Sequence, residues 1–131
     1  LYLGGHSKGG AEAIVFASKV DGLGNLVVGA VHVFGCPAVG DQEFANAYEA
    51  TLGGRTFSHV HRSDIVARSP ILLRMFGIYR RVGRVVYHSG NGQRTFRPSP
   101  IRRLIDFVRM VSRKRGLRDH AVGHYLVGTM K

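Results

Sequence analysis

A serine flanked by glycines, close to the start of this 131-residue chain, is the first group suited to covalent chemistry. The segment Gly5-His6-Ser7-Lys8-Gly9 fits the pattern G-x-S-x-G, which places a serine on a tight strand-to-helix turn. Such a turn exposes the hydroxyl as a nucleophile, and the glycines two positions to either side avoid a clash. The helix that follows directs its N-terminus at the site, so the backbone N–H of Lys8 is a candidate donor to an oxyanion.

The motif alone is short, and a glycine-rich structural turn would also produce it. Its surroundings favour the nucleophile, because Leu1-Tyr2-Leu3 is typical of a strand and an Ala-rich segment with helical spacing follows from Ala11. We therefore carry Ser7 forward as the candidate nucleophile.

A serine nucleophile requires a general base, and the base requires a carboxylate that orients it. In sheets with this type of turn the order along the chain is serine, acid, histidine. Asp64 is the best candidate acid, because it follows a predicted strand at 56–61 and the carboxyl edge of a sheet collects functional groups. His88 falls in another predicted strand, which leaves His120 and His124 as the candidate bases.

The elements that must position these groups alternate between strands and helices. We expect a strand ending at 1–3, a turn at 4–10, a helix from 11 to about 20 that Gly22 and Gly24 terminate, and a strand at 26–34 covered on both faces. A helix at 41–52 with Asp41 as its cap, a strand at 56–61 and a strand at 82–88 follow. This alternation predicts an α/β fold built on a parallel sheet.

The charge of the chain is uneven. Residues 1–73 carry five basic and six acidic groups, whereas residues 74–131 carry fourteen basic groups and two acidic ones. Ser99-Pro100 opens a predicted amphipathic helix that ends in Arg113-Lys114-Arg115. We interpret this helix first as a cover for the sheet with a solvated cationic face. Peripheral contact with an anionic lipid surface is the alternative, and we do not expect nucleic acid as a partner.

Five segments, in order, resemble the class 3 (fungal-type) triacylglycerol lipase family of the α/β-hydrolases. Gly4 to Ala11 resembles its G-H-S-L-G-G-A turn, with Lys8 in place of leucine as in related bacterial hydrolases. Phe34 to Ala45 is similar to F-G-x-P-R-V-G-[ND]-x-x-F-A, and His61 to Pro70 to N-x-x-D-x-V-P-R-x-P. The remaining two are Tyr79-Arg80-Arg81-Val82-Gly83 (Y-x-H-x-G) and Asp119-His120 with Tyr125-Leu126 (D-H-x-x-x-x-Y-[LIV]).

The resemblance implies a serine ester hydrolase that acts on acylglycerols or related lipid esters. It assigns Ser7 as nucleophile, Asp64 as triad acid and His120 as base, with His124 as the alternative base, because the spacing to Tyr125 favours His120. The backbone N–H of Lys8 is the implied oxyanion donor. Neither a metal nor an organic cofactor is implied.

The resemblance also implies an α/β-hydrolase fold of which residues 1–131 are a partial domain, corresponding to the C-terminal half. The family's earlier strands, its lid and its second oxyanion donor precede the matched turn. Ala38 replaces the usual arginine and Ala67 the usual proline. These departures leave open a non-catalytic module that binds lipid or a partner, and an inactive truncated fragment. The sequence gives no indication of compartment.

Two further groups have weaker interpretations. His59 and His61 lie two residues apart on one face of a predicted strand, but a metal site would require a third convincing ligand. Cys36 is the only cysteine, lacks an activating motif and is predicted to be buried filler.

Overall fold

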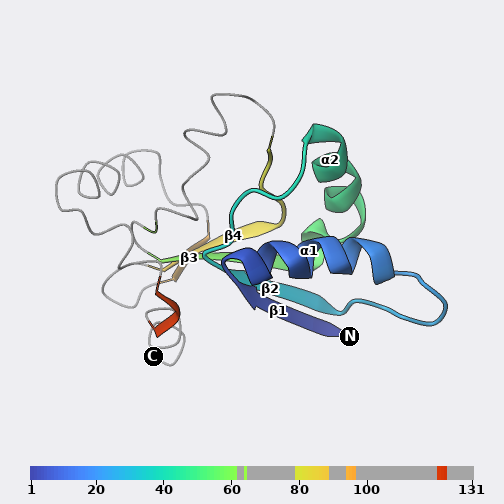
Figure 1. Ribbon diagram of the computed structural model, residues 1–131, viewed down its shortest axis with the longest axis horizontal. Coiled ribbons are helices and arrows are strands. Elements are labelled where there is room, and N and C mark those ends of the chain that lie inside the picture. The colour runs from blue at the N-terminus through green and yellow to red at the C-terminus, as the bar shows by residue number, and fades with distance from the viewer. Residues whose placement is uncertain (62–63, 65–78, 89–93, 97–120, 124–131) are drawn as a thin grey trace.

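The computed structural model describes residues 1–61, 64, 79–88, 94–96 and 121–123, and shows five strands in one sheet (Figure 1). The order across the sheet, β1-β2-β3-β4-β5, is also the order along the chain. Strands β1 to β4 pair in parallel, whereas β5 is antiparallel to β4. The elements are β1 (Tyr2–His6), α1 (Lys8–Val20), β2 (Ala30–Phe34), α2 (Gln42–Thr51), a 3-10 helix η1 (Gly53–Arg55), β3 (Thr56–His61), β4 (Arg84–His88) and β5 (Arg94–Phe96).

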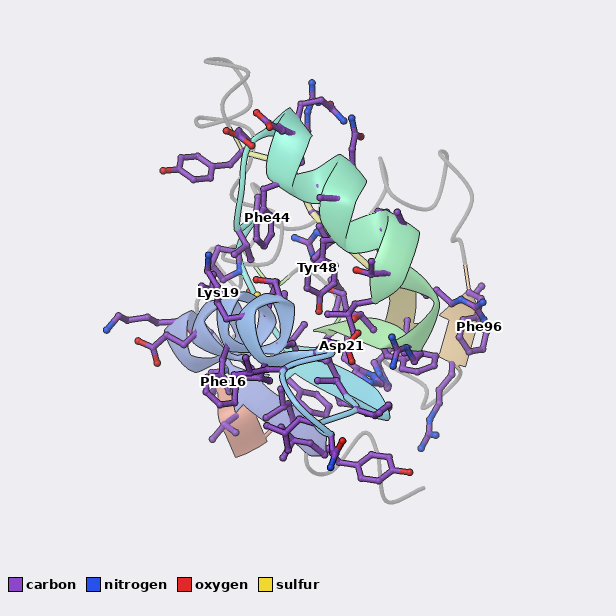
Figure 2. All side chains as sticks on the ribbon, turned by 90° about the vertical axis from the view of Figure 1, so that its right-hand side faces the viewer. Phe16, Lys19, Asp21, Phe44, Tyr48 and Phe96 are labelled. Carbon is purple, nitrogen blue, oxygen red and sulfur yellow. The ribbon has the colours of Figure 1, made fainter. Side chains whose placement is uncertain are left out.

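Both helices pack on the same face of the sheet, which we call the inner face. The β1-α1-β2 and β2-α2-β3 connections step in the same direction along the sheet, and right-handed crossovers then place both helices on one side. Figure 2 shows α2 above α1, with Phe44 and Tyr48 extending from α2. The buried core joins Ile14 and Ala17 of α1 to Val31 and Val33 of β2 and to Tyr48 of α2.

A buried polar contact fixes α2 on this core. The hydroxyl groups of Tyr48 and Thr56 lie 2.9 Å apart, and Thr56 also donates to the Leu52 carbonyl at 3.0 Å. Burial raises the pKa of Tyr48, so the phenol stays neutral and available for this hydrogen bond. The satisfied pair lets two hydroxyls sit inside an apolar core.

The opposite face, which we call the outer face, carries aromatic and histidine side chains. The prediction that the second strand is covered on both faces was wrong. In β2, Val31 and Val33 are buried, but His32 between them is exposed. The strand is also shorter than predicted, since Leu26 and Val27 precede it and are exposed. In β2 the inner face is therefore covered by the helices, while the outer face is open at His32.

The predicted strand at 56–61 is confirmed, as are α2 and β4 to within a few residues. The first element differs more, because the segment 4–10 is not one long turn. Strand β1 continues through Gly4 and Gly5 to His6, and α1 begins at Lys8. Only Ser7 lies between them. Among the described residues, no helix is long and apolar enough to cross a bilayer.

The loop that leads from α1 into β2 is held by a single arginine. Arg55 donates to the carboxylate of Asp21 at 2.9 Å, to the carbonyl of Thr51 at 3.1 Å and to the carbonyl of Val28. Asp21 in turn accepts from the Val28 N–H at 2.9 Å, which is the main cause of its lowered pKa. Arg55 thereby joins the end of α2 to the loop between α1 and β2.

Candidate active site

Ser7 occupies a strained turn between β1 and α1. Its φ of 55° and ψ of −124° make it the one non-glycine residue with positive φ in the part of the chain that the structure describes. A non-glycine residue in this region costs about 1–3 kcal/mol and persists where the surrounding structure fixes it, often at functional sites. Here the Ser7 N–H donates to the Phe34 carbonyl at 2.9 Å, while its own carbonyl accepts from Gly10 at 3.0 Å.

The Ser7 hydroxyl is not used to cap the helix that it precedes. A serine at this position ordinarily accepts a hydrogen bond from a first-turn N–H. The Ser7 side chain therefore does not act as a helix cap, whereas the Ser7 backbone is hydrogen-bonded to Phe34 of β2.

Two glycines let the strand and the helix approach closely enough to form this turn. A Cβ on Gly5 would lie 2.2 Å from the Gly9 carbonyl oxygen, and one on Gly10 would lie 3.1 Å from the Cβ of Cys36. A Cβ on Gly9 would meet nothing within 4 Å. The sequence motif points to Gly5 and Gly9, but packing restricts Gly5 and Gly10.

Lys8 is the first residue of α1, so its backbone N–H has no acceptor within the helix and lies next to Ser7. Its side chain extends into solvent, 90% exposed, and pairs with Glu12 one turn along at 2.9 Å. The hydrogen bond and charge of Glu12 raise the pKa of Lys8. The substitution of lysine for leucine therefore leaves the backbone donor in position.

Asp64 lies beyond the carboxyl end of β3, the same edge at which Ser7 follows β1. Asp64 is fully buried, and its backbone N–H donates to the His61 carbonyl at 3.0 Å. Strands β1 and β3 flank β2, so their axes are about 10 Å apart at strand spacings of about 4.8 Å. Ser7 and Asp64 therefore follow strands that lie two positions apart, at one edge of the sheet. His120 and His124 lie outside the described residues.

The segment after β2 completes this edge. Gly35 takes a positive φ of 57° and donates to the His59 carbonyl at 3.0 Å. Asp41 accepts from the Phe44 N–H at 2.8 Å, as predicted for a helix cap. Cys36 is buried, and desolvation raises the pKa of its thiol to about 11, so it is inert packing as predicted.

The structure also reveals a histidine cluster that the sequence did not predict. His59 does not pair with His61; its two ring nitrogens instead face His32 and His88 on the neighbouring strands. Among the described residues, no group of three or more histidine, cysteine, aspartate or glutamate side chains could hold a metal ion. The i, i+2 spacing within one strand was visible in the sequence, but contacts between strands depend on register.

Comparison with known proteins links this edge to one family. The family model described as lipase (class 3) matches residues 1–73, which include the Ser7 turn and Asp64. Among solved structures, the lipase from Rhizopus microsporus var. chinensis is 27% identical with a TM-score of 0.56, over 66% of this chain and 30% of that lipase. No curated protein sequence matches the chain.

Two further fungal structures are similar. Lipase II from Rhizopus niveus is 26% identical with a TM-score of 0.56, over 66% of this chain and 32% of that one. The Rhizomucor miehei lipase, solved as a propeptide complex, is 29% identical with a TM-score of 0.56, over 72% of this chain and 30% of that one. The chain thus spans about a third of the length of these lipases, and its mostly parallel sheet with flanking helices is part of an α/β-hydrolase fold.

Proposed function

Because this chain belongs to the class 3 lipase family, we propose that it carries the catalytic centre of a serine hydrolase that cleaves acylglycerols or related lipid esters. The observation that carries the proposal is the turn at Ser7. Its positive φ is fixed by the Phe34 carbonyl and by the close approach of Gly5 to Gly9, and its hydroxyl does not cap α1.

In the proposed mechanism the Ser7 oxygen attacks the ester carbonyl carbon while the base removes the serine proton. The backbone N–H of Lys8, at the N-terminus of α1, donates to the oxyanion that forms. The base then protonates the departing alcohol. Water, deprotonated by the same base, attacks the acyl-enzyme and releases the carboxylic acid and Ser7. His120 is the proposed base, with His124 as its alternative, and Asp64 is proposed to orient it.

The direct test uses the full-length protein that contains this chain. We expect Ser7→Ala to lower kcat on p-nitrophenyl and triacylglycerol esters by about 10⁴-fold or more, because the nucleophile is lost. Ser18→Ala is the matched control, since Ser18 lies on the same helix and its hydroxyl donates to the Val15 carbonyl of that helix. Undiminished hydrolysis by Ser7→Ala would contradict the proposal, and failure of a fluorophosphonate to label the wild-type protein would favour a binding module instead.

A second experiment decides between the two candidate bases. We expect His120→Gln to reduce kcat by about 10⁴-fold or more, as removal of a triad base does, while His124→Gln changes it by less than about tenfold. Both variants are assayed for ester hydrolysis at pH 8. Both are also exposed to the same amount of fluorophosphonate, so that labelling of Ser7 can be compared. The reverse pattern would transfer the role to His124, and near-wild-type activity in both variants would contradict a histidine base from this segment.

A further inference from the structure

Three histidines on three neighbouring strands form a continuous chain across the outer face. The Nδ1 atom of His32 on β2 lies 3.0 Å from Nε2 of His59 on β3. The Nδ1 atom of His59 in turn lies 2.9 Å from Nε2 of His88 on β4. Exposure falls along the chain, since His32 is exposed, His59 is half-buried and His88 is 3% exposed.

The rings meet edge to edge, with the paired nitrogens pointing at each other. The ring centroids of His32 and His59 are 5.3 Å apart, and those of His59 and His88 are 5.2 Å apart. Each value exceeds the corresponding nitrogen–nitrogen distance by about the width of one imidazole ring. The two nitrogens of each pair therefore lie close to the line joining the ring centres, along which their lone pairs or N–H bonds are directed.

This arrangement suits a shared proton and not a shared metal ion. A zinc–imidazole bond is about 2.0–2.1 Å long, so a metal between in-line nitrogens would hold them about 4 Å apart. The observed separations of 3.0 and 2.9 Å are instead ordinary lengths for an N–H···N hydrogen bond.

The two hydrogen bonds couple the tautomers of the three rings. A neutral imidazole donates from one nitrogen and accepts at the other. If His59 donates from Nδ1 to His88, its Nε2 must accept from His32, and all three rings carry their proton on Nδ1. The only other neutral arrangement places every proton on Nε2. His59 cannot change tautomer unless both of its neighbours change with it.

We propose that His32, His59 and His88 form a proton relay between solvent at the outer face and the buried carboxyl end of β4. A proton from water binds Nε2 of His32, whose Nδ1 proton passes to Nε2 of His59. The Nδ1 proton of His59 then passes to Nε2 of His88, and Nδ1 of His88 releases its proton to a neutral imidazole, that of His61, which pairs with His88 in the register. One proton enters and one leaves, and the three rings switch from the Nδ1–H to the Nε2–H tautomer.

The surroundings keep His59 and His88 neutral and hold the rings of the chain in place. Phe34 stacks on His59 with centroids 4.5 Å apart, and Phe57 stacks on His32 at 4.9 Å, each within 15° of parallel. Desolvation, followed by the charges of His88, His32 and Arg94, lowers the pKa of His59 to about 4. Desolvation, Arg94 and His61 lower the pKa of His88 as well. A proton is thus passed through the middle of the chain and not stored there.

The inner end of the relay lies beside the loop that carries the proposed triad acid. His88 pairs in register with His61, and the His61 carbonyl accepts the backbone N–H of Asp64 at 3.0 Å. The relay does not require ester hydrolysis, so it can be tested independently of the proposed function.

The test follows the imidazole protons of the full-length, ¹⁵N-labelled protein by NMR at pH 7.5. In the wild type we expect His32, His59 and His88 to share one tautomer in long-range ¹H–¹⁵N spectra. We expect His32→Gln to slow exchange of the His88 ring proton with water by roughly tenfold or more, because an amide can donate to His59 but cannot relay a proton. His6→Gln is the matched control, since His6 lies on the same face, separated from His59 by Phe34 in the register.

Unequal tautomers in the wild type would overturn the relay without any substitution, so the test survives a variant that fails to fold. An unchanged exchange rate in a folded His32→Gln protein would overturn it as well. Stoichiometric binding of Zn²⁺ that shifts the three imidazole signals together would replace the relay with a metal site.

Discussion

At the scale of single residues, the central feature is the Ser7 turn and the glycines that allow β1 and α1 to approach each other there. The sequence motif predicted both the serine and its tight turn, because the spacing of glycines around a nucleophile is a local pattern. It did not predict which glycines are restricted by packing. That depends on the distance between the backbones of β1 and α1, to which Gly5 and Gly10 contribute and Gly9 does not.

A pair of matched substitutions tests this distinction. We expect Gly5→Ala to lower the free energy of unfolding by about 3 kcal/mol or more, because its Cβ would lie 2.2 Å from the backbone oxygen of Gly9 and neither backbone can yield easily. Gly9→Ala should be neutral or stabilising by up to about 1 kcal/mol, since the site is open and alanine favours a helix. Urea denaturation of both variants measures the difference, and equal effects would contradict the packing described here.

At the scale of elements, the alternating strands and helices of residues 1–88 were largely predictable. The exceptions have physical causes. Gly4 and Gly5 resemble turn residues in the sequence, yet they belong to β1 because they pair with His32 and Val33 of β2. Leu26 and Val27 resemble strand residues, yet pairing with β1 begins only at Ala30. In both cases a neighbouring element, and not local preference, sets the boundary.

The loop between α1 and β2 depends on a contact that no local pattern reveals. We expect Arg55→Ala to lower the free energy of unfolding by about 2–3 kcal/mol, because Asp21 and the carbonyl of Val28 lose a charged donor. Arg55→Lys should recover only part of this loss, since an ammonium cannot reproduce the planar fork. Denaturant midpoints provide the measurement, with Arg84→Ala, an exposed arginine on β4, as the control. Full recovery by lysine would show that charge alone is required.

At the scale of the whole molecule, the sequence predicted a parallel α/β sheet and a candidate acid, Asp64, at the same edge as Ser7. Two aspects were beyond its reach. The histidine chain arises from the register of three strands, which pairs residues 27 and 29 positions apart. The basic half, with His120 and His124, lies largely outside the described residues, so the assignment of the base stays a prediction.

Stability should respond to pH through His59. Its pKa of about 4 lies below the value of about 6.5 in the unfolded chain, so the unfolded state binds more protons between these two values. Stability is fully present above about pH 6.5 and is lost as the pH falls toward about 4. A full shift would correspond to about 3 kcal/mol, which partial exposure of the ring reduces to about 1–2 kcal/mol.

The measurement is the free energy of unfolding at intervals between pH 7 and pH 4.5. This window excludes Asp21, whose lowered pKa places its contribution below about pH 4. His59→Gln should reduce the slope without abolishing it, since glutamine does not titrate but His88, whose pKa is also lowered, still does. An identical slope in the wild type and in His59→Gln would show that another group is responsible.

The agreement between strand order in the sheet and strand order along the chain has a consequence for biosynthesis. As the polypeptide leaves the ribosome, the partner of each new strand from β2 onward has already emerged. Each strand can therefore dock on a template as soon as it appears, without waiting for a later segment to fill a gap. The Ser7 turn is formed with the Phe34 carbonyl and α1. Its geometry can therefore be complete before Asp64, His120 and His124 have been translated.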